Sequence, residues 1–193
     1  MRKAPAKTPA FVYVKVTLNK IRPAIWRRLL LPVSLNLGEL SRVILGTMGW
    51  RGGHLHVFEI GGREYGDPQM VEDAEDERRM TLAKLIAEGV SRFVYTYDFG
   101  DDWDHVVLIE KKSPPSEAQS PACVAGERAC PPEDCGGEPG YKELLAALKA
   151  PDRPESRELL EWADEDFDPE DFSLEEADRR VKTFFGASRA QPR

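Results

Sequence analysis

Residues 11–18 decide the fold, because Phe11-Val-Tyr-Val-Lys-Val-Thr-Leu18 places a valine or leucine at every second position. A period of two is typical of a β-strand with one buried face. A second strand is predicted at residues 25–31, after a turn at Asn19-Lys20. The chain is therefore expected to begin with a β-hairpin.

A helix is predicted directly after this hairpin. Pro32 ends the second strand, and Asn36 followed by Glu39 has the spacing of a helix capping box. Apolar residues then recur at helical spacing as far as Met48, and Gly49 is suited to end the helix. The first three elements are thus expected in the order strand, strand, helix.

The rest of the chain continues with strands and ends with helices. Further strands are predicted at residues 54–60, 63–65, 92–98 and 104–111, a short helix at 81–87 and an exposed acidic loop at 66–79. A long loop rich in Pro and Gly is predicted at 113–139, and helices at 141–149, at 154–163 and from Ser173 onward. The order predicts an α+β fold whose sheet is mixed or mostly antiparallel. We expect a β-grasp-like start, helices packed on one face and a helical C-terminal region.

Length and composition are those of one soluble globular domain. The chain has 193 residues, of which 41% are hydrophobic and 32% charged. We expect the domain at residues 11–185, between a flexible basic segment at 1–10 and a loose tail at 186–193. No apolar stretch suits a signal peptide or a membrane helix, so we expect a cytoplasmic protein without a membrane partner.

Charge is distributed unevenly along the chain. Residues 1–53 hold ten Lys or Arg and one acid, which gives +9, and residues 113–193 hold 19 acids and ten bases, which gives −9. The two parts either complement each other within the fold or leave the basic part free to face a polyanion. Both interpretations are open at this stage.

One segment gathers most of the polar chemistry. Tyr95-Thr-Tyr-Asp-Phe-Gly-Asp-Asp-Trp-Asp-His105 carries four carboxylates and an imidazole within eight residues. Carboxylates beside a histidine orient the ring, raise its pKa or share a cation with it. The candidate catalytic residues are therefore Asp98, Asp102 and His105. The alternative is a polar turn whose Asp side chains cap backbone N–H groups.

Cysteine and histidine residues suggest zinc as a cofactor. Cys123, Cys130 and Cys135 are candidate metal ligands, and His54, His56 or His105 would complete a tetrahedral set. His54 and His56 lie two residues apart on a predicted strand, which places both rings on one face. The cysteine spacing is wider than in most structural zinc sites, so the alternative is three small buried thiols that pack the loop.

The N-terminal hairpin carries a third candidate site. Ile21-Arg-Pro-Ala-Ile-Trp-Arg-Arg28 interleaves an aromatic residue with bases, as surfaces that bind single-stranded nucleic acid do. The candidate binding residues are Arg22, Trp26, Arg27, Arg28 and, in the polar segment, Trp103. Trp26 is alternatively a core residue. A serine nucleophile elbow, a phosphate-binding loop and a dinucleotide fingerprint are all absent from the sequence.

Four segments together are similar to one known family. They are Ile21 to Arg28, Met48-Gly-Trp50 with His54 to Ile60, Tyr95 to His105, and Pro121-Ala-Cys with Ala129 to Gly137. This combination resembles the plasmid pRiA4b ORF-3-like proteins. The resemblance implies a passenger protein of plasmids and other mobile elements, some of which are labelled resolvase-like. Ser34 and Ser41 lie at or in an ordinary amphipathic helix, so the residues do not support recombinase activity.

Three hypotheses about function follow. The leading one is a non-catalytic binding module, in which the polar segment and the cysteine-containing loop form a rigid recognition face for a protein or nucleic-acid partner. The second is a metal-dependent hydrolase or nuclease that uses His54, His105 and nearby carboxylates. The third is nucleic-acid binding through the basic hairpin. The first two require the histidine-bearing strands and the cysteine-containing loop to meet on a shared surface.

Overall fold

The structure is a computed structural model that describes residues 11–112, 114, 120–163 and 167–190. The strands are β1 (Phe11–Leu18), β2 (Trp26–Pro32), β3 (His56–Ile60), β4 (Arg63–Gly66), β5 (Glu75–Asp76), β6 (Arg92–Tyr97), β7 (Trp103–Ile109) and β8 (Ala122–Glu127). The helices are α1 (Leu37–Met48), α2 (Leu82–Ala87), α3 (Gly137–Lys149), α4 (Pro154–Trp162) and α5 (Leu174–Ala190), with a short 3-10 helix at Glu77–Arg79.

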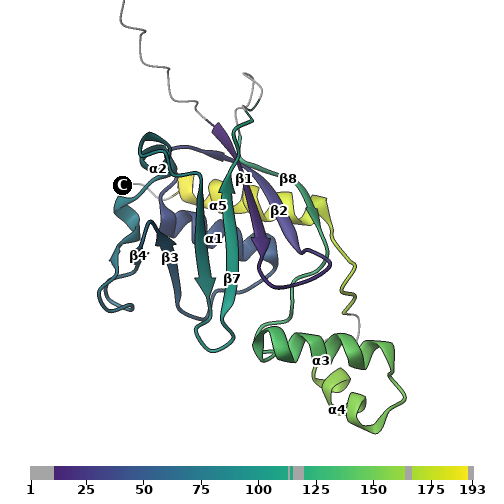
Figure 1. Cartoon of the computed structure of the whole chain (residues 1–193). Helices are drawn as coiled ribbons and strands as arrows, with labels where there is room; N and C mark the ends of the chain where they lie inside the picture. Colours follow the sequence, from purple (N-terminus) through teal and green to yellow (C-terminus); the bar gives the residue numbers. More distant parts are fainter. Residues whose placement is uncertain (1–10, 113, 115–119, 164–166, 191–193) are drawn as a thin grey trace, which may run out of the picture.

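All the strands belong to one sheet. Its order is β5-β4-β3-β6-β7-β1-β2-β8, and the neighbours are antiparallel except for the short pair β4 and β5. Helices α1 and α5 pack against each other behind this sheet (Figure 1). The predicted fold class is confirmed. The protein has an α+β fold with a mostly antiparallel sheet, helices on one face of the sheet and a helical C-terminal region.

The opening of the chain folds as its pattern predicts. β1 and β2 form an antiparallel hairpin in which Val14 lies opposite Leu29, and every second residue of β1 is buried. Helix α1 begins with the capping box of Asn36 and Glu39. It ends at Gly49, whose φ of 102° lies in the left-handed region that glycine adopts without strain.

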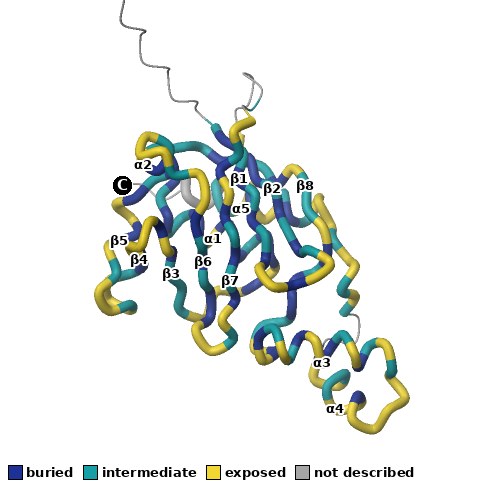
Figure 2. Tube along the Cα trace, in the orientation of Figure 1, coloured by how far each residue is buried: buried dark blue, intermediate teal, exposed yellow. Residues whose placement is uncertain are grey.

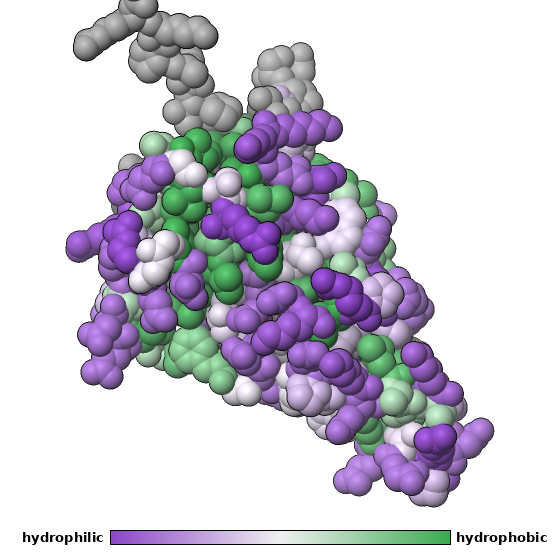
Figure 3. Space-filling view, viewed as in Figure 1, coloured by the Kyte–Doolittle hydropathy of each residue, from purple (hydrophilic) through white to green (hydrophobic). Residues whose placement is uncertain are grey.

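The buried residues lie mainly in the strands and in the helices behind them (Figure 2). The face that α1 and α5 leave open carries hydrophilic and hydrophobic side chains side by side (Figure 3). Along β1 and β7, buried residues alternate with more exposed ones, as in an antiparallel sheet with one face on the core and one toward solvent. Helices α3 and α4 pack on each other and project away from the sheet (Figure 1).

The second half of the chain differs from the predicted elements at one loop, and its last helix is longer than the pattern suggests. Residues 122–127 form β8, although a loop is predicted over 113–139. Ala-Cys-Val-Ala-Gly-Glu has no apolar alternation, and pairing with β2 at the sheet edge makes it a strand. Helix α5 continues through Gly186 to Ala190, since one glycine costs a helix only about 1 kcal/mol, and the loose tail from residue 186 stays a prediction. The predicted flexible ends at 1–10 and 191–193 lie outside the described residues.

In the part of the chain that the structure describes, no helix is both long and apolar enough to cross a membrane.

Candidate functional site

Three residues from distant parts of the chain meet at one end of the sheet. His54 lies just before β3, Asp98 just after β6, and Asp134 in the cysteine-containing segment. The His54 Nδ1 atom is 3.6 Å from Asp98 Oδ2, and its Nε2 atom is 3.3 Å from Asp134 Oδ1. Among the described residues, this is the one group of at least three His, Cys, Asp or Glu side chains whose ligand atoms all lie within 4.8 Å of one another. It is the candidate cation site.

Strand pairing brings the first two of these residues together. β3 and β6 are antiparallel, with His56 opposite Tyr97, so the start of β3 lies beside the end of β6. The Asp98 N–H group continues this pairing by donating to the Leu55 carbonyl at 2.9 Å. The candidate site thus rests on the sheet rather than on a free loop.

A turn fixes the orientation of the Asp98 side chain. Asp98 has a φ of 59°, a left-handed value that Asp tolerates better than most residues. Its Oδ1 atom accepts from the N–H groups of Gly100 at 2.9 Å and Asp101 at 3.4 Å. Its Oδ2 atom faces His54. The same carboxylate therefore caps the turn, as the alternative interpretation expects, and takes part in the candidate site.

The cysteine-containing segment packs against this end of the sheet. The Trp50 indole N–H donates to the Pro131 carbonyl at 2.8 Å, and the Tyr97 hydroxyl donates to Glu133 Oε1 at 2.7 Å. Burial, together with this hydrogen bond, raises the pKa of Tyr97 to about 12, so the phenol keeps its proton at neutral pH. The segment is held at residues on both sides of Pro132, which positions the neighbouring Asp134.

A close backbone contact holds the far end of the same segment. The Gly136 N–H group donates to Asp101 Oδ2 at 3.2 Å. Gly137 has a φ of 66°, and a Cβ atom there would lie 2.5 Å from the Asp101 carbonyl oxygen. Only glycine fits this position. The polar turn and the cysteine-containing segment therefore share one surface, as the first two hypotheses require.

A cleft of about 680 Å³ adjoins the candidate site and is lined in part by His54 and His56. His56 Nε2 lies 2.8 Å from Oε2 of the buried Glu77, at hydrogen-bond distance. Met70 and Phe99 also line the cleft, and 62% and 48% of their surfaces are exposed. The cleft therefore combines polar groups that are already paired with apolar side chains open to solvent.

The structure corrects the prediction that His54 and His56 share one strand face. β3 begins at His56, and His54 lies in the bend before it. The two rings consequently turn to different carboxylates: His56 to Glu77, and His54 to Asp98 and Asp134.

The three thiols do not join the histidines. Burial raises the pKa of Cys123 to about 11 and the pKa values of Cys130 and Cys135 to about 12. Cys130 Sγ lies 3.2 Å from the sulfur of Met48. Within the described ranges, no cysteine belongs to a group of three metal-type ligands. The geometry agrees with the alternative interpretation of small buried thiols.

Asp102 and His105 also lie apart from the candidate site. Asp102 is exposed and lies 4.0 Å from Lys20 Nζ. His105 is fully buried, its Nδ1 atom is 3.2 Å from the Tyr95 carbonyl, and burial lowers its pKa to about 4. Of the three candidate catalytic residues, Asp98 alone faces the cleft.

The arginines of the basic hairpin do not lie together on one exposed surface. Arg27 is buried, and its guanidinium donates to four backbone carbonyls at 2.9 Å, those of Trp26, Thr47, Glu127 and Arg128. Arg28 pairs with Glu110 at 2.9 Å. Arg27 therefore stabilises the fold and cannot reach a nucleic acid.

The other predicted binding residues are scattered. Arg22 is exposed and donates to the Ile21 carbonyl at 2.7 Å. Trp26 is half-buried, and its indole N–H donates to Glu127 at 3.0 Å. Trp103 is 3% exposed and belongs to the core. The structure does not bring these residues together into one binding surface.

Sequence reasoning misses two residues of this region, Glu77 and Asp134. Glu77 stands in a run of acidic residues, where nothing in the pattern distinguishes it. Asp134 directly precedes Cys135 in the cysteine-containing segment. This position beside a candidate metal ligand is the one sequence feature that could have drawn attention to it. Both residues become notable only when tertiary contacts bring them to the histidines.

The chain is similar to proteins from two named microorganisms. The uncharacterized protein y4hQ of Sinorhizobium fredii (strain NBRC 101917 / NGR234) is 36% identical over 154 residues, which are 78% of this chain and 79% of y4hQ. A crystal structure from Methanosarcina mazei Go1, described as that of a protein of unknown function, MM3350, is 35% identical with a TM-score of 0.78. It matches 86% of this chain and 97% of its own.

The family comparison agrees with the motifs. The plasmid pRiA4b ORF-3-like protein family matches residues 10–176, which include the sheet, α1, α3 and α4. The chain belongs to the plasmid pRiA4b ORF-3-like protein family.

Proposed function

We propose that the protein is a binding module in which His54, Asp98 and Asp134 hold a divalent metal ion that captures a ligand in the adjacent cleft. The observation that carries this proposal is the group of three ligand atoms within 4.8 Å of one another. A role of such a module in plasmids or other mobile elements, suggested by the family's description, belongs to the same proposal.

The separations around His54 differ from those of an ordinary hydrogen bond. His56 and Glu77 are 2.8 Å apart, whereas the two carboxylate oxygens lie 3.3 and 3.6 Å from the His54 nitrogens. One ion is bound by only one nitrogen of an imidazole, and the ligand atoms of a tetrahedral zinc ion with bonds of 2.0 to 2.2 Å are about 3.4 Å apart. The 3.3 Å separation of His54 Nε2 and Asp134 Oδ1 is close to this value, and the three ligand atoms of the group lie within 4.8 Å of one another.

Charge and ligand type also favour a cation. The two carboxylates of the group carry a charge of −2, which a divalent ion neutralises. One imidazole and two carboxylates suit Zn²⁺ or Mn²⁺. Three protein ligands leave coordination positions open, as in sites where a metal binds water or a ligand. These positions would be available to a coordinating group, such as a carboxylate or a phosphate, of a ligand in the cleft.

The experiment is metal titration of the chelator-treated protein by calorimetry, with elemental analysis of the complex. We expect one Zn²⁺ or Mn²⁺ per chain, and a loss of affinity of about tenfold or more in D98N and in D134N. D102N is the matched control, since it makes the same change at an exposed aspartate of the same turn. Absence of binding to the wild type, or equal affinities in all three variants, rejects the proposal.

A metal-dependent hydrolase is the second candidate, because open coordination positions beside a cleft also suit an activated water. His105 has no part in this version, since it lies in the core. Hydrolysis of bis(p-nitrophenyl) phosphate by the metal-loaded protein, lost in D134N, would establish the enzyme. Metal binding without hydrolysis favours the binding module.

A further inference from the structure

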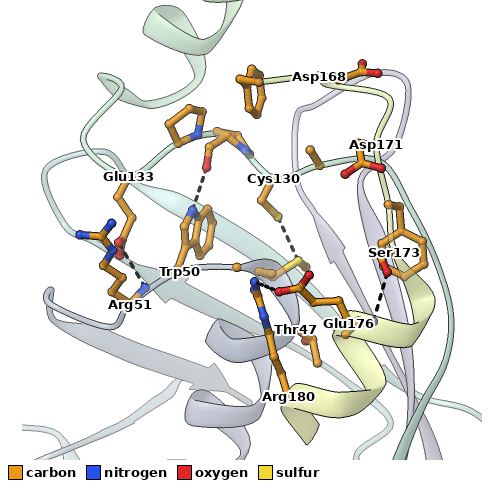
Figure 4. Close-up of a pocket in the computed structure, with 18 of the residues that line it drawn as sticks. Thr47, Trp50, Arg51, Cys130, Glu133, Asp168, Asp171, Ser173, Glu176 and Arg180 are labelled. Atoms are coloured by element: carbon orange, nitrogen blue, oxygen red, sulfur yellow. Dashed lines mark hydrogen bonds and ion pairs between the residues drawn. The ribbon is translucent and has the colours of Figure 1, made fainter. Parts of the chain in front are cut away.

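A second and larger cavity lies on the other side of the cysteine-containing segment. Its volume is about 840 Å³, within the range of small-molecule sites. The walls come from the C-terminal end of α1, residues 129–134, the end of α4, residues 167–173 and the start of α5. Figure 4 shows Trp50 on one side of this cavity, Asp171 and Ser173 on the other, and Glu176 with Arg180 between them.

Aromatic side chains line the cavity from four positions: Trp50, Trp162, Phe167 and Phe172. Trp162 is 48% exposed, which is unusual for so large an apolar side chain. The ring of Phe172 already holds a cation on one face, since the Arg27 guanidinium lies 4.3 Å from its centroid. Rings of this kind attract a positive charge placed over their faces.

Two of the three arginines that line the cavity have their guanidinium groups bonded within the protein. Arg27 donates to the four carbonyls named above. Arg180 donates to Glu176 at 2.6 Å and to the Gly46 carbonyl at 3.2 Å. These two guanidinium groups are bonded within the protein, and the exposed Arg51 is the third base of the lining.

The acids of the cavity outnumber its bases. Among the described residues, five acids line it, Glu133, Asp134, Asp168, Asp171 and Glu176, against the three arginines Arg27, Arg51 and Arg180. Glu176 pairs with Arg180, and Glu133 accepts hydrogen bonds from Tyr97 and from the Arg51 backbone. Asp168 and Asp171 are exposed and form no ion pair with any described residue. Asp134 faces His54 at 3.3 Å, and Asp168 Oδ1 accepts from the Glu170 N–H group at 2.8 Å, so Asp171 and the second oxygen of Asp168 are left for a ligand.

We propose that this cavity binds an organic cation, an ammonium or guanidinium group on an apolar body. Asp168 and Asp171 attract the charge, and the aromatic rings cover the apolar body. This is the complementarity by which proteins recognise quaternary ammonium ligands. The inference goes beyond the metal-dependent module, because it concerns a different cavity and does not require the ion.

The test is a titration of chelator-treated protein with benzyltrimethylammonium, followed by tryptophan fluorescence and calorimetry. We expect saturable binding that weakens about tenfold in W162L and in D171N, since one cation–π contact or one charge pair is removed in each. D152N, an exposed aspartate between α3 and α4, is the control and should bind as the wild type does.

Charge selectivity separates this site from a general apolar one. Benzylsulfonate has a similar apolar body and the opposite charge, and it should not compete with the cation. Absence of benzyltrimethylammonium binding, equal binding of both probes, or wild-type affinity in both W162L and D171N overturns the proposal. Because the metal has been removed, none of these results requires an ion at the His54 site, and Asp134, which borders both that site and this cavity, is unchanged in every variant.

Discussion

The cleft beside His54 and the interior beneath β2 and β8 carry similar residue types in opposite settings. At the cleft, His54 is about one-third exposed between two carboxylates. In the interior, Arg27, Cys123 and Cys130 are all less than 9% exposed, and the arginine contacts backbone carbonyls instead of acids. The residues with the most conspicuous chemistry in the sequence are thus divided between a candidate site and the core.

The difference shows that residue type alone does not define a site. An imidazole, a thiol or a guanidinium acts on a ligand only under two conditions. The group must be accessible to the ligand, and its protein partners must leave at least one of its hydrogen-bonding or coordinating atoms free. His105 and Cys130 fail the first condition, and Arg27 fails both. Three experiments test this contrast, in order of decreasing expected effect.

Arg27→Met should cause the largest loss of stability. The substitution keeps the apolar stem but leaves four carbonyls without their donor, and each buried unsatisfied group costs about 1 to 3 kcal/mol. We expect the free energy of unfolding in urea to fall by about 3 kcal/mol or more. Arg28→Met removes a partly exposed pair with Glu110 and should cost less than about 1 kcal/mol. Equal losses in the two variants would contradict the structural role assigned to Arg27.

His105 should make stability depend on pH. Its pKa is about 4 in the fold, below the usual 6.5, so between these values the unfolded chain binds a proton that the folded chain does not. Stability is therefore full above pH 6.5 and falls as the pH drops toward 4, with a slope of at most about 1.4 kcal/mol per pH unit. Urea unfolding of the wild type and of His105→Gln at pH 5 to 7.5 measures this slope. Parallel curves for the two proteins would show that His105 is not neutral and buried.

The thiols should have the smallest effect on the cation site. Cys130 has a pKa of about 12 and is buried, so it should react with a disulfide reagent at pH 8 only as fast as the protein opens. Cys130→Ala should bind Zn²⁺ with the affinity and stoichiometry of the wild type. Lower zinc content in this variant, measured by elemental analysis, would show that the cysteines are metal ligands after all.

Several local features can be predicted from the sequence because their causes are local. The alternation in residues 11–18 requires one buried face, so β1 is predictable, and the capping residues Asn36 and Gly49 set the bounds of α1. β8 cannot be predicted in this way, because its small residues become a strand only by pairing with β2. A strand with one buried face can be recognised from the alternation of its side chains. Whether an edge segment forms a strand depends also on the neighbouring strand that supplies its hydrogen-bond partners.

The candidate site follows the same rule. The polar turn containing Asp98 is evident from its composition, and so are the two histidines. Their partners are not, because Asp134 is 80 residues from His54 in the chain, as their numbers show, and meets it only through the docking of the cysteine-containing segment.

The sequence by itself determined the family, the sheet-forming hairpin, the first helix and the polar turn, all of which depend on short-range pattern and backbone preference. The tertiary structure alone decided that His54 faces two carboxylates, that His105 and the thiols are buried, and that Arg27 is a core residue. The physical reason is that accessibility and pairing are properties of the folded neighbourhood, which brings together side chains that chain order keeps apart.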